Sequence, residues 1–348
     1  MLRKGKDVSR MLDLRLENNR LKTMDYIKGF SIFSIALMHL LYFMKDMPAS
    51  VLKLSGIGGT GGHVFFVCSG IGLYLSHLNK KSDFSAFIKN RFVKIYVPYI
   101  IVVFIAFLLP NQYSGDDRFA ALLSHVFLYK MFLPQYQETF GEHFWFVSTI
   151  IQFYFLFMPM YKIKEKLNNN KAFFLIFFAI SVFWWILCYK LGVGSVRVWN
   201  SFCLQFIWEF AMGFIIAEKF YEGRVFKIRK SLLLIAAVAG IGLQGALAFT
   251  SDVLRLFNDV PGVIGYTAMA LLLMDIKPIK WLCTKISDFS FEYYLVHMLV
   301  FSNIFYFIKP ESLPMQIALG LVSIFIALAA GSVYSKIVKK IINKKYFV

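Results

Sequence analysis

Long apolar runs alternate with short, basic polar segments along the whole chain. A helix needs about 20 mostly apolar residues to cross the hydrocarbon core of a bilayer. Ten runs approach this length, so the pattern predicts an all-α polytopic bundle of about ten transmembrane helices. The runs are 26–44, 61–76, 95–109, 143–161, 172–189, 200–217, 231–250, 261–275, 288–308 and 315–334.

Two other segments are apolar only in part. Residues 119–133 lie between polar loops and contain a histidine and a lysine, so we expect an interfacial or re-entrant segment. The first 24 residues are polar, mixed in charge and unlike a cleavable signal peptide. Their apolar positions Met11, Leu12 and Leu16 predict a basic amphipathic helix on the membrane surface.

The distribution of charge predicts the orientation in the membrane. The chain has 38 Lys and Arg against 20 Asp and Glu, a net charge of +18. Twenty-nine of the basic residues lie on the side where ten spans place both termini, and eight lie on the opposite side. Basic loops remain cytoplasmic, so we expect both termini in the cytoplasm. We divide the chain into a basic N-terminal segment 1–24, a membrane domain 25–335 and a basic tail 336–348.

Composition excludes most other classes of protein. Hydrophobic residues make up 58% of the chain and charged residues only 17%, which excludes disorder and does not fit a nucleic-acid binder. No cysteine lies in a CxxC motif or at metal-ligand spacing from a histidine, so we expect buried free thiols, no disulfide and no metal site. These features fit a multi-pass protein of a bacterial inner (plasma) membrane.

Lys28 and His39 are the clearest ionisable pair inside a predicted span. They are 11 residues apart, about three turns, so they share one helix face. Separately, Lys28 could be an anchor at the membrane surface and His39 a histidine that packs between helices. Together they fit an anionic cofactor that enters from the cytosol and reaches an imidazole capable of proton transfer.

Other polar positions add to this picture. Arg91 and Lys94 share a helix face at the inner surface and are either a topology signal or a phosphate clamp. Glycines open the second span, where close helix packing is the simpler explanation and an unwound cavity lining the alternative. Glu209 is an isolated acid for which we favour a structural hydrogen bond or a protonated carboxyl group. The remaining candidates for substrate binding or support are His143, Trp145, Ser148 and Gln152 in the fourth span and Glu292, Tyr294 and His297 in the ninth.

Five motifs in order resemble those of the integral-membrane acyltransferase 3 family of bacteria. They are Asp25-Tyr-Ile-Lys28-Gly with His39, Phe65-Phe-Val-Cys-Ser69-Gly70, Arg91-Phe-Val-Lys94-Ile-Tyr-Val-Pro98, His143-Phe-Trp145-Phe and Ser290-Phe-Glu-Tyr-Tyr294-Leu-Val-His297. Lys28 and Lys94 replace the arginines more common in the family. Ile150 and Ile151 stand where many members carry acids, which argues against an acid-assisted version of the chemistry.

The resemblance implies transfer of an acyl group, often acetyl, from acyl-CoA to a hydroxyl of a cell-surface or lipid-linked glycan. It implies that His39 is the catalytic histidine, that Lys28 is its basic partner, and that Arg91 and Lys94 hold the phosphates of the donor. His39 would serve as general base or as transient acyl carrier, and the residues do not distinguish the two. A separate extracytoplasmic transferase is a further expected partner. The rival hypotheses are an exporter of polysaccharide or lipid-linked sugar, in which midplane ionisable residues line the path, and a flippase that only positions a lipid-linked sugar.

Overall fold

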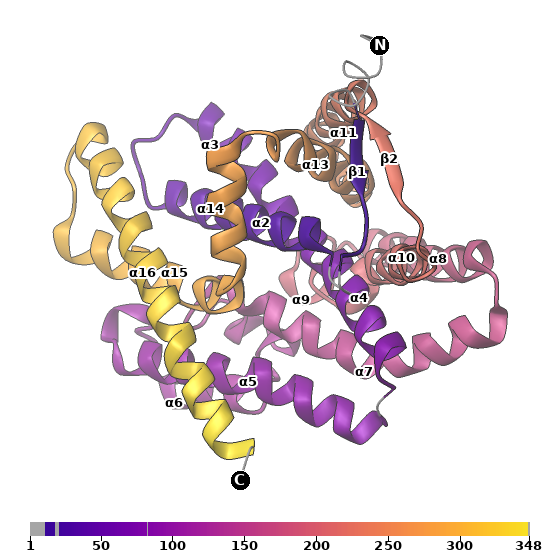
Figure 1. The fold of residues 1–348 in the computed structure, drawn as a ribbon. Helices are drawn as coiled ribbons and strands as arrows, with labels where there is room; N and C mark the ends of the chain where they lie inside the picture. The colour runs from indigo at the N-terminus through magenta and orange to yellow at the C-terminus, as the bar shows by residue number, and fades with distance from the viewer. Residues whose placement is uncertain (1–10, 18–20, 82, 347–348) are drawn as a thin grey trace.

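The computed structural model describes residues 11–17, 21–81 and 83–346, and in this part of the chain the structure is almost entirely helical (Figure 1). Nine helices or helix pairs are long and apolar enough to cross a membrane, and a tenth span arises if one bent pair is counted, all within the described residues. The predicted bundle of about ten helices is thus confirmed. In chain order the elements of the first half are β1 (Met11–Leu14), α2 (Lys22–Tyr42), α3 (Ala49–Ser55), η1 (Gly56–Thr60), α4 (Gly61–Asn79), α5 (Phe84–Leu108), η2 (Pro110–Gln112), α6 (Arg118–Val126), η3 (Lys130–Phe132), η4 (Pro134–Tyr136), η5 (Glu142–Phe144) and α7 (Trp145–Leu167).

The second half continues with the same alternation of long helices and short connections. Its elements are α8 (Asn170–Lys190), α9 (Arg197–Asn200), α10 (Cys203–Tyr221), β2 (Phe226–Arg229), α11 (Lys230–Thr250), α12 (Asp252–Arg255), α13 (Asp259–Leu273), α14 (Lys277–Ser287), α15 (Ser290–Ile308) and α16 (Leu313–Tyr346). The eighth predicted span, 261–275, corresponds to α13, which begins and ends two residues earlier, and the chain then bends by 116° into α14. The last helix continues far into the predicted basic tail, because no glycine or proline interrupts residues 332–346.

The N-terminal segment differs from its prediction. Residues Met11–Leu14 form a strand, not part of a surface helix, and this strand pairs antiparallel with β2 (Figure 1). Met11 lies opposite Arg229 and Leu14 opposite Phe226. Pairing with a distant strand satisfies the backbone, which local helix propensity cannot reveal. The predicted amphipathic helix is therefore wrong where the structure describes this segment.

Glycines allow two central helices to pack closely, as the sequence indicated. A Cβ on Gly70 of α4 would lie 2.4 Å from the backbone oxygen of Phe210, and one on Gly213 of α10 would lie 2.5 Å from that of Val67. Only glycine fits at such a crossing. The predicted re-entrant stretch 119–133 folds into α6 and η3, in which His125 and Lys130 are buried.

Candidate functional site

A large cavity of about 1060 Å³ opens between the helices and is lined by five of the eleven predicted site residues. Its walls come from α2, η1, α4, α7, α10, α13 and α15, with loop residues 192–197 among the rest. The predicted residues that line it are Lys28, His39, His143, Trp145 and Tyr294. Cavities between helices are common ligand sites, and this one combines aromatic walls with a few ionisable groups.

Three histidines from three different helical segments meet at this cavity. The Nδ1 atom of His39 lies 2.8 Å from the Nε2 atom of His297, and their rings stack at 5.1 Å. The ring of His143 lies 6.2 Å from that of His39 and 5.1 Å from that of His297. His297 does not itself line the cavity but is buried next to His39. The distant motifs that carry these histidines therefore form one cluster.

The hydrogen bonds of His297 determine the tautomers in this cluster. Its Nδ1 atom lies 2.7 Å from the carbonyl oxygen of Tyr294, and a carbonyl can only accept, so Nδ1 carries the proton. Nε2 of His297 must then accept from Nδ1–H of His39. The Nε2 atom of His39 is left with its lone pair free, as a base or nucleophile requires. A neutral histidine here occupies the place that a carboxylate holds in a Ser-His-Asp triad.

His143 is held by its backbone rather than by its ring. The Tyr294 hydroxyl donates to its carbonyl oxygen. Both ring nitrogens are buried and have no hydrogen-bond partner within the described residues. An unpaired buried imidazole is costly unless a bound molecule satisfies it, so His143 is a candidate to hydrogen-bond a substrate.

A buried lysine fixes the loop that leads to His143. The ammonium of Lys130 donates to the carbonyl oxygens of Thr139, at 3.3 Å, and Gly141, at 3.1 Å. Gly141 has φ of +144°, a conformation that other residues rarely adopt. Burial lowers the pKa of Lys130 to about 7, although Glu142 and Glu138 oppose the shift. The burial of this lysine was not predicted, although it lies in the expected interfacial or re-entrant stretch 119–133.

His125 stabilises the same loop. Its Nδ1 atom lies 2.6 Å from the hydroxyl of Tyr99, and its Nε2 atom lies 3.0 Å from the carbonyl oxygen of Thr139. Burial holds the pKa of His125 well below its usual value, so the ring is neutral. The loop before His143 is thus anchored by two buried side chains that do not reach the cavity.

Trp145 is fixed in the wall of the cavity. The guanidinium of Arg197 lies 5.6 Å from the centre of its ring and also pairs with Glu142 at 3.0 Å. The indole also packs against Gly62, where a Cβ would be 3.8 Å from the ring. An immobilised indole is a good stacking surface for a sugar or another flat apolar face.

The remaining predicted residues lie outside the cavity lining. Arg91 is half-buried and Lys94 exposed, although their neighbour Ile95 does line the cavity. Gln152 accepts a hydrogen bond from the backbone N–H of Cys203 at 3.2 Å, and Ser148 is buried. Glu292 lies beside Ser335 and Lys339 of α16. The structure thus gives Gln152 a place in helix packing.

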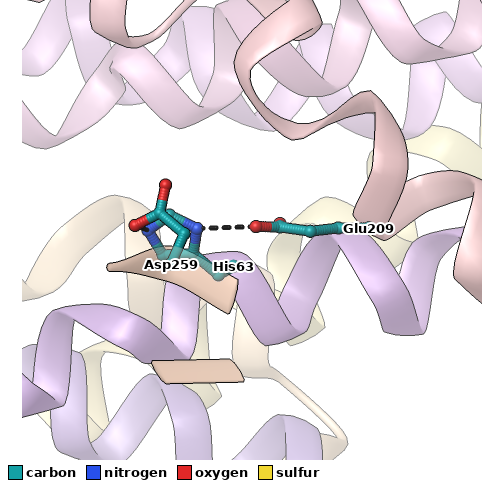
Figure 2. A group of neighbouring side chains, drawn as sticks. All are labelled: His63, Glu209 and Asp259. Carbon is teal, nitrogen blue, oxygen red and sulfur yellow. Dashed lines mark hydrogen bonds and ion pairs between the residues drawn. The ribbon is translucent and has the colours of Figure 1, made fainter. Parts of the chain in front are cut away.

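A second ionisable cluster on the same cavity was not predicted (Figure 2). Nδ1 of His63, in α4, lies 2.8 Å from Oε1 of Glu209, in α10. Nε2 of His63 lies 3.5 Å from Oδ1 of Asp259, in α13. The three residues are far apart in sequence, so no local motif reveals them. A search for opposite charges among the ionisable residues of the spans could have paired His63 with Glu209.

The sequence matches a family model described as an acyltransferase domain, that of the acyltransferase 3 family, over residues 21–336. Comparison with curated proteins and with solved structures gives no match.

Proposed function

The chain belongs to the acyltransferase 3 family, and on this premise we propose that it moves an acetyl group from acetyl-CoA to a hydroxyl of a cell-envelope glycan. The family match and the apolar helices make it an acyltransferase with many membrane spans. The donor, the acceptor and the acyl chain are part of the proposal. Transport without chemistry, the rival hypothesis, is not favoured by the family.

One observation supports the chemistry of the proposal: His39 lines a large cavity, and its Nδ1 atom is hydrogen-bonded to Nε2 of His297. In the proposed reaction Nε2 of His39 takes the proton of the acceptor hydroxyl as its oxygen attacks the acyl carbon. The C–S bond of the thioester then breaks, and the departing thiolate takes the proton from His39. The two histidines share the positive charge that develops, since His297 accepts from the protonated ring.

His143 and Trp145 are proposed to hold the reacting groups. The ring of His143 lies beside His39, and its one N–H can donate to the carbonyl oxygen of the thioester, where negative charge develops. The fixed indole of Trp145 provides a surface on which an acceptor sugar can stack. Tyr294 supports both functions because its hydroxyl donates a hydrogen bond to the backbone carbonyl of His143 and because it lines the cavity itself.

We place the anionic part of acetyl-CoA near Lys28, the cation of α2 that lines the cavity. Arg91 and Lys94 are proposed to meet its phosphates at the rim, since they precede the lining residue Ile95 in the same helix without reaching the cavity themselves. Lysine binds phosphate as a point charge without the paired contacts of arginine. Ser148 and Glu292 would act through packing rather than by contact with either substrate.

The proposed topology has both termini in the cytoplasm of a bacterial cell. The pairing of β1 with β2 agrees with one part of it, since it requires the N-terminal segment and the α10–α11 loop to lie on the same side of the membrane. Six candidate spans separate these strands, an even number, as pairing on one side requires. The acceptor is then reached from the outer end of the cavity, directly or through a separate extracytoplasmic transferase.

The test is transfer of labelled acetyl from acetyl-CoA to cell-envelope glycan by the purified protein in vesicles. We expect His39→Ala to lower the rate by about 10²- to 10⁴-fold, the contribution of a general base. His77→Ala is the control, because His77 is also buried in a helix but packs against Tyr161 away from the cavity. Full activity of His39→Ala would refute the mechanism. Sugar uptake in the absence of any acyl donor would instead point to a transporter.

A further inference from the structure

We propose that His63, Asp259 and Gln205 bind a divalent metal ion on the wall of the cavity, with Glu209 fixing the orientation of His63. Figure 2 shows His63, Glu209 and Asp259. His63, Glu209 and Asp259 each offer a ligand atom, and these atoms all lie within 4.8 Å of one another. The sequence predicted no metal site, and the proposal departs from that prediction. Metal binding itself does not depend on the proposed acyl transfer.

The two sides of the His63 ring have different environments. Nδ1 forms a 2.8 Å hydrogen bond with Glu209, whose side chain is fully buried. A carboxylate can only accept, so Nδ1 donates and the lone pair of the neutral ring lies on Nε2. Histidines that bind metals usually donate their other N–H to such a carboxylate, which fixes tautomer and orientation.

The gap between His63 and Asp259 suits a bridging ion. Nε2 and Oδ1 lie 3.5 Å apart, at the limit of a hydrogen bond. Zinc bonds of about 2.0–2.2 Å to nitrogen and oxygen, at tetrahedral angles, separate two ligand atoms by about 3.4 Å. A zinc ion would therefore fit between them with little movement of either side chain.

Two side chains of the cluster carry buried oxygen atoms without a partner among the described residues. Gln205 donates from Nε2 to Oδ2 of Asp259 at 3.1 Å, and its own Oε1 is buried without a partner among the described residues. The second carboxylate oxygen of Glu209, Oε2, is likewise buried and unpartnered within that part of the chain. The amide of Gln205 and the carboxylate of Asp259 offer the oxygen ligands that accompany imidazole at zinc and manganese sites.

The charge of the cluster also calls for a cation. Two carboxylates face one histidine, so the cluster stays negative even if the ring is protonated. Neither carboxylate pairs with a lysine or arginine in the described part of the chain. Uncompensated negative charge inside a membrane protein is costly, and a bound divalent ion would offset it. Because His63, Gln205 and Asp259 line the cavity, the open ligand positions would face a substrate.

If the proposed acyl transfer is right, such an ion would bind the acceptor. A metal-bound hydroxyl has a lowered pKa and gives up its proton more easily to a base. The two clusters that adjoin the cavity would then have different functions in the reaction. The His39 cluster would take the proton, and the His63 cluster would hold and polarise the acceptor oxygen.

The experiment measures zinc in the purified full-length protein. The protein is stripped with a chelator, loaded with Zn²⁺ alone, desalted and analysed by mass spectrometry for bound metal. We expect about one zinc per chain in the wild type, as in other single zinc sites. His63→Ala and Asp259→Asn should lose it, and Glu209→Gln should bind it about 10- to 100-fold more weakly. His77→Ala, a histidine of the same helix outside the cavity, should retain it.

Two further variants separate the possible failures. His39→Ala should lose acyl transfer but keep its zinc, so a failed acyl-transfer proposal does not disturb the metal result. Zinc that is lost with His297→Phe and kept in His63→Ala would belong to the other histidine cluster and would overturn the proposal. A wild type that retains no more zinc than His63→Ala would also overturn it. If His63→Ala fails to elute as a single species in size exclusion, the nearly isosteric Asp259→Asn decides the question.

Discussion

Replacement of His297 by phenylalanine tests the most specific feature of the catalytic proposal. The variant keeps a ring of similar size but cannot accept the 2.8 Å hydrogen bond from Nδ1 of His39. When His39 takes a proton this bond becomes charge-assisted, and such bonds contribute about 1.5–3 kcal/mol. At about 1.36 kcal/mol per tenfold change in rate, the loss corresponds to a decrease of about 10- to 160-fold. His297→Phe should therefore be impaired, but less than His39→Ala.

The assay is the initial rate of labelled acetyl transfer at saturating acetyl-CoA, for both single variants and for the double variant. Residues that act as one unit are strongly non-additive. We expect the double variant to be no slower than His39→Ala, because His297 acts only through His39. His297→Gln should recover part of the rate, since its amide oxygen can accept the same hydrogen bond. If the two losses multiply in the double variant, His297 has a separate function and the reasoning is wrong.

Three further predictions concern other parts of the structure. Lys28→Gln should raise the KM for acetyl-CoA with little change in kcat. The control Lys22→Gln, at the exposed start of the same helix, should leave both constants unchanged. Equal effects of the two substitutions would exclude Lys28 from donor binding. Gly70→Ala should lower stability by about 1–3 kcal/mol, because its Cβ meets backbone at 2.4 Å, whereas Gly72→Ala, whose nearest contact is 3.9 Å away, should be tolerated in thermal unfolding. Burial lowers the pKa of Lys130 to about 7, so the folded state releases a proton that the unfolded chain holds up to its ordinary pKa near 10.5. Stability should then rise by up to about 1.4 kcal/mol per pH unit from pH 7 towards 10, and Lys130→Met should abolish that rise; identical slopes in the two proteins would refute the assignment.

The sequence was most informative where function leaves ionisable residues in apolar helices. His39, His143 and His297 were each unusual for a membrane span, and each lay in a motif of the family. The structure brings them into one cluster. The helices were predictable for a similar reason, since a bilayer imposes length and composition on every span.

The parts that could not be predicted depend on long-range pairing. Met11–Leu14 has the composition of a surface helix, and only its partner strand, more than 200 residues later, makes it a strand. His63, Glu209 and Asp259 meet because α4, α10 and α13 pack together, and none has a local signal of the others. Arg91 and Lys94 have the spacing of a clamp, but spacing along one helix does not show which face meets the cavity.

The pairing of β1 with β2 also has a consequence for biosynthesis. The ribosome makes Leu14 more than 200 residues before its partner Phe226. At about 5–20 residues per second, the first strand waits roughly 10–40 s for the second. Six candidate spans enter the membrane during that interval. The two-stranded sheet therefore ties the N-terminal segment to the α10–α11 loop only after the first six spans are inserted. A large tag fused close to Met11 would interfere with this late step rather than with insertion itself.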